Sequence, residues 1–85
     1  MYYVYLIKNK ITKEIYIGYT NDLKQRFKDH NQGRVISTKN RRPFILVYYE
    51  AYNSKRDAQE REKQIKRRAK ALISLKRRIK NSLLN

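Results

Sequence analysis

The chain has 85 residues, and its 22 Lys and Arg against 7 Asp and Glu give a net charge of +15 at pH 7. It has no Cys and one His, which excludes disulfides, thiolate metal sites and His-rich zinc sites. This length predicts one domain, residues 1–85, with a single small core. The apolar runs are too short to span a membrane, and no signal peptide is expected.

A charge this positive predicts a polyanionic partner and a soluble, cytoplasmic protein. The 8 Tyr and 2 Phe that accompany the charge favour nucleic acid over an anionic membrane. A disordered basic tail is excluded, because 40% of the residues are hydrophobic and 12% are aromatic.

Two short runs of aromatic and β-branched residues, 2–7 and 15–20, predict strands that pair as an antiparallel hairpin. Alternation along these strands places Tyr5 and Tyr16 on the same face of the hairpin. Gly18 lies beside them, and a glycine inside a strand is typical of a close approach. The tyrosines are equally explained by the preference of Tyr for strands.

A helix is predicted over about residues 22–31, with Asn21 or Asp22 as its N-cap. Arg26 and His30 are four residues apart, so they share a face of this helix next to its apolar pair. Taken separately, each is also compatible with an ordinary exposed position.

Residues 44–52 predict a third strand that is nearly apolar on both faces, as in a strand that is covered on both sides. Helical patterns follow over residues 54–69 and 70–83, as two helices or as one long bent helix. The predicted order is β-β-α-β-α-α. This is an α+β fold, with a small three-stranded antiparallel sheet flanked by helices.

Basic residues gather in the loop 33–42 and beyond Glu62, where nine Lys and Arg follow and no acidic residue occurs. Such segments are either solvated or in contact with phosphates, and they specify no sequence. The side chains that we expect to contact phosphates are Arg34, Lys39, Arg41, Arg42, Lys63, Lys66, Arg67 and Arg68.

Glu62 falls within an apolar helical stripe formed by Ala58, Ile65, Ala69 and Leu72. A carboxylate that faces a core is costly unless it is paired with a cation. The residues leave two interpretations open: a salt bridge with one of the many Lys and Arg, or a functional carboxylate.

In this order and spacing, Tyr3-Val4-Tyr5, Tyr16-Ile17-Gly18, Arg26, His30 and Glu62 resemble the motifs of the GIY-YIG nuclease superfamily. The likeness covers residues 3–66. It is closest to the small single-domain bacterial members, which are related to the N-terminal nuclease domain of UvrC.

The resemblance implies an endonuclease that hydrolyses DNA phosphodiester bonds with one Mg²⁺ or Mn²⁺ ion. Glu62 would bind the metal, and Arg26 would stabilise the charge that develops on the phosphate. Tyr5 and Tyr16 would position the attacking water, one of them as a phenolate base. His30 would assist this step or contact phosphate. A single inward carboxylate suits one hydrated ion, whereas two-metal sites need clustered carboxylates.

The chain departs from the family pattern at three places. The first motif reads Tyr-Val-Tyr, and Tyr19 stands where a basic residue often follows the second motif. Many members also have an Asn near the site late in the chain, and Asn81 is only a remote candidate for it. We expect low sequence specificity and a role in DNA repair or processing, with RNA as another substrate. The alternatives are a non-catalytic nucleic-acid-binding module and a protein-interaction domain whose basic helix docks on an acidic surface.

Overall fold

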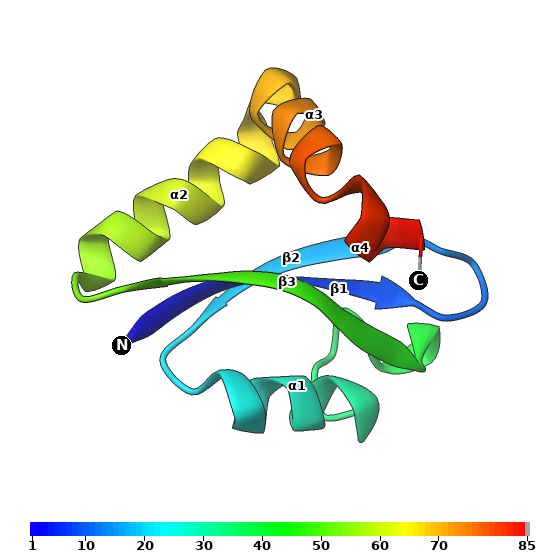
Figure 1. Ribbon diagram of the computed structural model, residues 1–85. Helices are drawn as coiled ribbons and strands as arrows, with labels where there is room; N and C mark the ends of the chain where they lie inside the picture. The colour runs from blue at the N-terminus through cyan, green and yellow to red at the C-terminus, as the bar shows by residue number, and fades with distance from the viewer. Residues whose placement is uncertain (85) are drawn as a thin grey trace.

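The structure, a computed structural model, describes residues 1–84. Its order of elements confirms the predicted α+β fold, with the last predicted helix divided in two (Figure 1). The elements are β1 (Tyr2–Asn9), β2 (Ile15–Thr20), α1 (Leu23–Asn31), a 3₁₀ turn (Lys39–Arg41), β3 (Phe44–Tyr52), α2 (Lys55–Arg67), α3 (Ala69–Arg78) and α4 (Lys80–Leu84).

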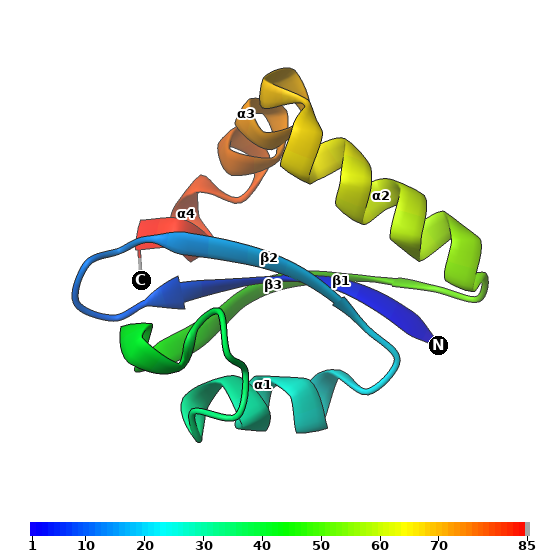
Figure 2. The same cartoon turned by 180° about the vertical axis from the view of Figure 1, so that it is seen from behind.

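The three strands form one antiparallel sheet in the order β2-β1-β3, so β1 lies at its centre. Helices α2, α3 and α4 cover one face of this sheet, and α1 covers the other (Figures 1 and 2). Because side chains alternate along β1, the central strand supplies both layers of the core.

The larger core lies between the sheet and the three C-terminal helices. Val4 and Leu6 of β1 are fully buried there. They form one cluster with buried residues of α2 and of the segment that follows it, namely Ala58, Ile65, Leu75 and Ile79. This layer fixes the position of α2 above the sheet.

The smaller core lies between the sheet and α1, and it contains Tyr5, Ile7 and Phe44. Asp22 begins α1 by accepting a hydrogen bond from the N–H of Gln25, as predicted for a capping residue. At the other end, the Asn31 side chain accepts from the N–H of Phe44 and donates to its carbonyl, at 2.7 and 3.0 Å. These bonds hold α1 against β3.

The prediction that residues 44–52 are covered on both sides is confirmed, although β3 lies at the edge of the sheet: Phe44 and Leu46 pack in the smaller core, and Tyr52 packs against the larger one. A register shift opposite Leu6 and Ile7 interrupts the alternation of side chains along β3. It places Val47 and Tyr48, neighbours in sequence, both against the larger core.

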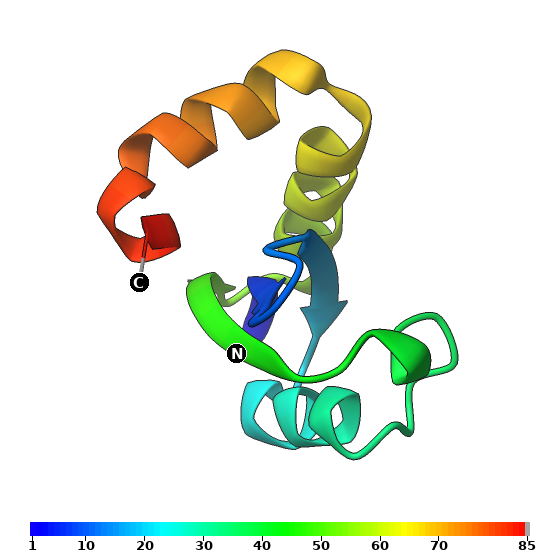
Figure 3. The ribbon, with the colours of Figure 1, turned by 90° about the vertical axis from the view of Figure 1, so that its right-hand side faces the viewer.

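The two C-terminal helical patterns form separate helices. Arg68 has an extended backbone and lies between α2 and α3, so the bent single helix is excluded. The predicted stripe is interrupted there, because Ala69 is exposed, and it resumes at Leu72, which packs against the larger core. The break turns α3 back over the sheet, where Leu75 reaches the core (Figure 3).

A partly buried ion pair anchors α2 to β3. The Arg61 guanidinium donates to both carboxylate oxygens of Glu50, with Nε 2.9 Å from Oε1. The hydroxyls of Tyr48 and Tyr52 donate to the same carboxylate. This pair fixes the rotation of α2 about its own axis, and so it also determines the direction in which the next residue, Glu62, points.

Within residues 1–84, no helix combines the length and the apolar character that crossing a membrane requires.

Candidate active site

A cavity of about 170 Å³ is lined by residues of β1, β2, α1, α2 and the loop that precedes β3. All five predicted catalytic residues line it: Tyr5, Tyr16, Arg26, His30 and Glu62. Figure 3 shows these elements, with α2 above β2 and α1 below it. The motif residues, which span much of the chain, therefore meet in one place.

Tyr5 is almost fully buried, and its ring lies against Gly18 on the neighbouring strand. A Cβ atom on Gly18 would come within 2.2 Å of the Tyr5 hydroxyl oxygen. Glycine is therefore required at this position for the space it leaves, as the sequence predicted.

Replacing Gly18 by Ala is expected to lower the free energy of unfolding by about 1–3 kcal/mol, because the added methyl displaces the Tyr5 ring. Urea unfolding measures the change. A matched pair of variants isolates the contact: in a Tyr5→Ala background, Gly18→Ala should cost much less. An equal cost in both backgrounds would show that the ring does not make this contact.

A chain of hydrogen bonds runs from Tyr5 through His30 to Thr38. The Tyr5 hydroxyl lies 2.7 Å from Nε2 of His30, and Nδ1 of His30 lies 2.8 Å from Oγ1 of Thr38. Burial raises the pKa of Tyr5, although the charge of Arg26 opposes this shift. Burial and then Arg26 lower the pKa of His30, which favours the neutral imidazole.

The free energy of unfolding should fall as the pH drops from about 7 to about 5. The unfolded chain protonates His30 near pH 6.5, whereas the folded protein does so at lower pH. In this window the unfolded state binds more protons, so stability rises with pH by at most about 1.4 kcal/mol per pH unit.

His30 is the only histidine of the chain, so the comparison with His30→Gln is direct. Denaturant unfolding at a series of pH values should show a much weaker slope for the variant. Equal slopes in the two proteins would mean that His30 has an ordinary pKa in the folded state.

Tyr16 lines the cavity, but its hydroxyl donates to Oε2 of Glu14, 2.8 Å away. The same carboxylate pairs with Arg41 at 3.1 Å. Desolvation and this bond to Glu14 raise the pKa of Tyr16. The hydroxyl of Tyr16 is thus held by exposed groups at the edge of the sheet, whereas that of Tyr5 is held inside.

Arg26 extends from α1 into the cavity, and its Nε is buried without a hydrogen-bond partner among the described residues. A buried donor without an acceptor costs about 1–3 kcal/mol. An anion in the cavity would satisfy it, and a guanidinium is the side chain best shaped to bind a phosphate.

Glu62 faces the cavity from α2, and its side chain is 21% exposed. Its Oε2 pairs with Nζ of Lys66, one helical turn on, at 3.0 Å. The salt-bridge interpretation of Glu62 is confirmed, and its role as a functional carboxylate stays a prediction.

Within residues 1–84, no three His, Asp or Glu side chains gather into a metal cage. The donors present suit one hydrated Mg²⁺ or Mn²⁺ ion, which uses one or two carboxylates together with substrate phosphate oxygens. Glu62 is the carboxylate of the cavity that fits this role.

A family model for the GIY-YIG catalytic domain matches residues 1–78. The chain belongs to the GIY-YIG family. A UPF0213 protein of Staphylococcus haemolyticus is 44% identical over 66 residues, which cover 76% of this chain and 79% of the relative. The UPF0213 protein YazA of Bacillus subtilis is 39% identical over 87 residues, or 96% and 87% of the two chains.

A UPF0213 protein of Bacillus halodurans, solved by NMR in solution, shows the same fold. It shares 40% sequence identity with this GIY-YIG domain, at a TM-score of 0.52, and the match covers 89% of this chain and 86% of the other. The predicted resemblance to small bacterial members of this nuclease superfamily is confirmed.

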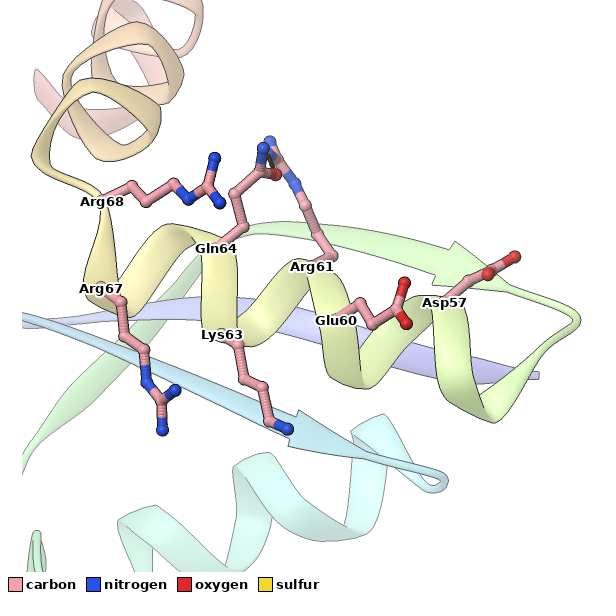
Figure 4. A pocket seen from close by; sticks show the side chains of 7 residues that line it. All are labelled: Asp57, Glu60, Arg61, Lys63, Gln64, Arg67 and Arg68. Carbon is pink, nitrogen blue, oxygen red and sulfur yellow. Dashed lines mark hydrogen bonds between the residues drawn. The ribbon is translucent and has the colours of Figure 1, made fainter.

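The predicted phosphate-contacting residues of α2 divide between two sides of the helix. In Figure 4, Lys63 and Arg67 extend in the direction of β2, whereas Arg68, at the end of the helix, extends toward the side chain of Gln64. These four residues line a hollow of about 550 Å³ together with Asp57, Glu60 and Arg61. Lys66 instead lines the cavity of the motif residues.

The cations of the basic loop are exposed, and two of them are paired within the GIY-YIG domain. Arg34 contacts Asp29 at 3.3 Å, and Arg41 contacts Glu14. The other two are adjacent, since Nε of Arg42 donates to the carbonyl of Lys39 at 2.8 Å. All four stay candidate phosphate ligands.

Lys66 and Thr38 line the cavity, which was not predicted from the sequence. Lys66 was predicted to contact phosphates only, although its spacing of four from Glu62 on a helix indicates a shared face. Thr38 was not singled out at all, because no pattern in the loop distinguishes it from its neighbours. Tyr19, where many GIY-YIG members carry a cation, packs its side chain against the larger core.

Proposed function

We propose that the chain is a metal-dependent endonuclease that hydrolyses phosphodiester bonds of DNA with low sequence specificity. The observation that carries this proposal is the cavity, which Glu62, Tyr5 and His30 line together with Arg26, whose buried Nε has no acceptor among residues 1–84. A phosphate diester supplies the missing acceptor and the negative charge.

Arg26 and Glu62 divide the electrostatic task. The Arg26 guanidinium binds a non-bridging oxygen of the scissile phosphate and stabilises the charge that grows there in the transition state. Glu62 would hold a divalent ion, which when bound would supply positive charge to the phosphate and the leaving oxygen. Lys66 pairs with the carboxylate of Glu62 and orients it between substrates.

The attacking water loses its proton through Tyr5 and His30. Burial raises the pKa of Tyr5, so the free protein does not hold a phenolate ready. Instead, the Tyr5 oxygen takes the proton of the water while its own hydroxyl proton moves to Nε2 of His30, 2.7 Å away. His30 begins neutral and can accept this proton, because its pKa is lowered.

Tyr16 has a supporting part in this proposal. Its ring stacks edge-on against Phe44, with centroids 5.4 Å apart, and closes the cavity beside Tyr5. Since its hydroxyl is bonded to Glu14, we assign Tyr16 to positioning the water and the phosphate, and Tyr5 to the proton transfer.

The substrate class follows from charge and shape. Lys66 lines the cavity, and Lys63 and Arg67 of the same helix extend toward β2, where they would contact neighbouring phosphates. Phosphate contacts carry no sequence information, which accounts for low specificity. A cytoplasmic role in DNA repair or processing belongs to the same proposal and rests on the resemblance to the UvrC nuclease domain.

The proposal is tested by incubating the purified protein with supercoiled plasmid, linear duplex, single-stranded DNA and RNA in Mg²⁺, Mn²⁺ or EDTA. Nicked or cut DNA should appear in either metal ion and not in EDTA. Tight binding without cleavage of any substrate would instead favour the non-catalytic nucleic-acid-binding module. Binding alone supports neither, because a protein of charge +15 binds DNA regardless of function.

A further inference from the structure

Thr38 is a buried polar residue in a basic loop whose charged side chains are exposed. It is 3% exposed, and its hydroxyl oxygen lies 2.8 Å from Nδ1 of His30. The backbone fixes it there: its N–H donates to the carbonyl of Val35 at 3.1 Å, and its carbonyl accepts from the N–H of Arg41 at 2.9 Å. The hydroxyl is thus presented to the imidazole by a rigid turn.

In a neutral histidine, the hydrogen-bond partner of one ring nitrogen determines whether the other nitrogen is protonated. A neutral imidazole carries a single N–H, and the hydrogen bond made by one nitrogen selects the tautomer. For Nε2 of His30 to accept a proton from Tyr5, the N–H must be on Nδ1. The atom within reach of that N–H is Oγ1 of Thr38.

We propose that Thr38 is a positioning residue that accepts the N–H of Nδ1 and so keeps Nε2 of His30 open toward the Tyr5 hydroxyl. This assignment rests on the proposed function for its catalytic meaning. In the reaction, the water proton passes to the Tyr5 oxygen, the Tyr5 O–H bond breaks, and an N–H bond forms at Nε2. The water oxygen bonds to phosphorus as the bond to the leaving oxygen breaks.

Thr38 serves both protonation states of His30 without moving. The imidazolium formed by the transfer carries an N–H on each nitrogen, and the one on Nδ1 still points at Oγ1. The Tyr5 oxygen, which has then received the water proton, faces the new N–H on Nε2. No side chain has to rotate during the step, which is the arrangement that favours fast proton transfer.

The tautomer is measurable without any substrate, because His30 is the only histidine of the chain. Two-bond ¹H–¹⁵N correlation spectra at about pH 8, where the imidazole is neutral, give one set of ring signals. We expect a protonated Nδ1 and an unprotonated Nε2 in the wild-type protein. The opposite tautomer in the wild-type protein would overturn the proposal, and this measurement depends on no variant.

Thr38→Val keeps the shape of the side chain and removes the acceptor, whereas Thr38→Ser retains it. In Thr38→Val, both tautomers should appear and the nicking rate constant should fall about 10- to 100-fold, as when partners that orient metal-bound histidines are lost. Thr38→Ser should restore the tautomer and most of the lost rate. A merely structural threonine would not couple the tautomer to the rate.

The two readouts separate this proposal from the proposed function. An unchanged tautomer and an unchanged rate in a folded Thr38→Val protein would overturn the role of Thr38. The expected tautomers, together with no cleavage by the wild-type protein in any metal ion, would support the assignment of Thr38 to His30 and overturn the nuclease.

Discussion

Replacing Glu62 by Gln is expected to lower the rate constant of plasmid nicking by about 10³-fold, because a bound ion contributes several kcal/mol to the transition state. The amide keeps the size of the side chain and loses the charge that holds the ion. Affinity for DNA should stay unchanged or rise, since the substitution removes a negative charge near the phosphates. Nicking assays under single-turnover conditions and a binding titration measure the two effects.

Glu60→Gln is the matched control for this prediction. Glu60 lies on the same helix, its side chain is 66% exposed, and it pairs with Arg56 across one turn. The substitution changes the net charge by the same amount, and it leaves the cavity intact. Glu60→Gln should therefore nick DNA at close to the wild-type rate. Equal losses in the two variants would show that the effect comes from charge and not from a metal ligand.

Replacing Arg26 by Ala should lower the nicking rate constant by about 10²- to 10³-fold, as for the loss of other groups that stabilise transition-state charge. Arg26→Lys should recover part of this loss, because it keeps the charge but not the forked geometry. The effect should fall on the chemical step, so that saturating substrate does not restore the rate. Single-turnover rates over a range of protein concentrations make this distinction.

The control for Arg26 is Lys28→Ala, two residues further along α1. Lys28 is exposed and does not line the cavity, and its removal subtracts the same positive charge. We expect a small loss of DNA affinity in both variants and a loss of chemistry in Arg26→Ala alone. If Lys28→Ala lost as much activity, Arg26 would be one more member of a diffuse basic surface.

Both cavity variants test an arrangement that the sequence predicted well. Tyr5, Tyr16, Arg26, His30 and Glu62 were identified by spacing and resemblance, and all five line one cavity. The reason is that each lies in an element with a strong local signal: an alternating strand, a capped helix or an amphipathic helix. Local periodicity then determines the face on which each side chain lies.

Features that depend on long-range geometry could not be predicted. The bulge that places Val47 and Tyr48, neighbours in sequence, on one face of β3 arises from its pairing with β1. The break at Arg68 involves no Gly or Pro, so nothing in the local sequence marks it. Both follow from packing against distant elements.

Thr38 is the clearest case of a site residue that sequence analysis misses. It belongs to an irregular loop, where no periodicity assigns a face, and its role depends on the turn from Val35 to Arg41. In the structure, the Thr38 hydroxyl connects this loop to His30. For the proposed proton transfer, this hydroxyl matters more than the basic residues around it. The loop thus contributes to the proposed chemistry as well as to charge.

The most direct test of the account is the nicking rate constant of the wild-type protein and of Glu62→Gln as a function of Mg²⁺ concentration, on one supercoiled plasmid. For the wild-type protein, the rate should rise from the EDTA baseline to a plateau. For Glu62→Gln, it should stay near the baseline across the same range while DNA binding persists. A Glu62→Gln curve that reaches the wild-type plateau at the same Mg²⁺ concentrations would contradict the assignment of this cavity as the catalytic site.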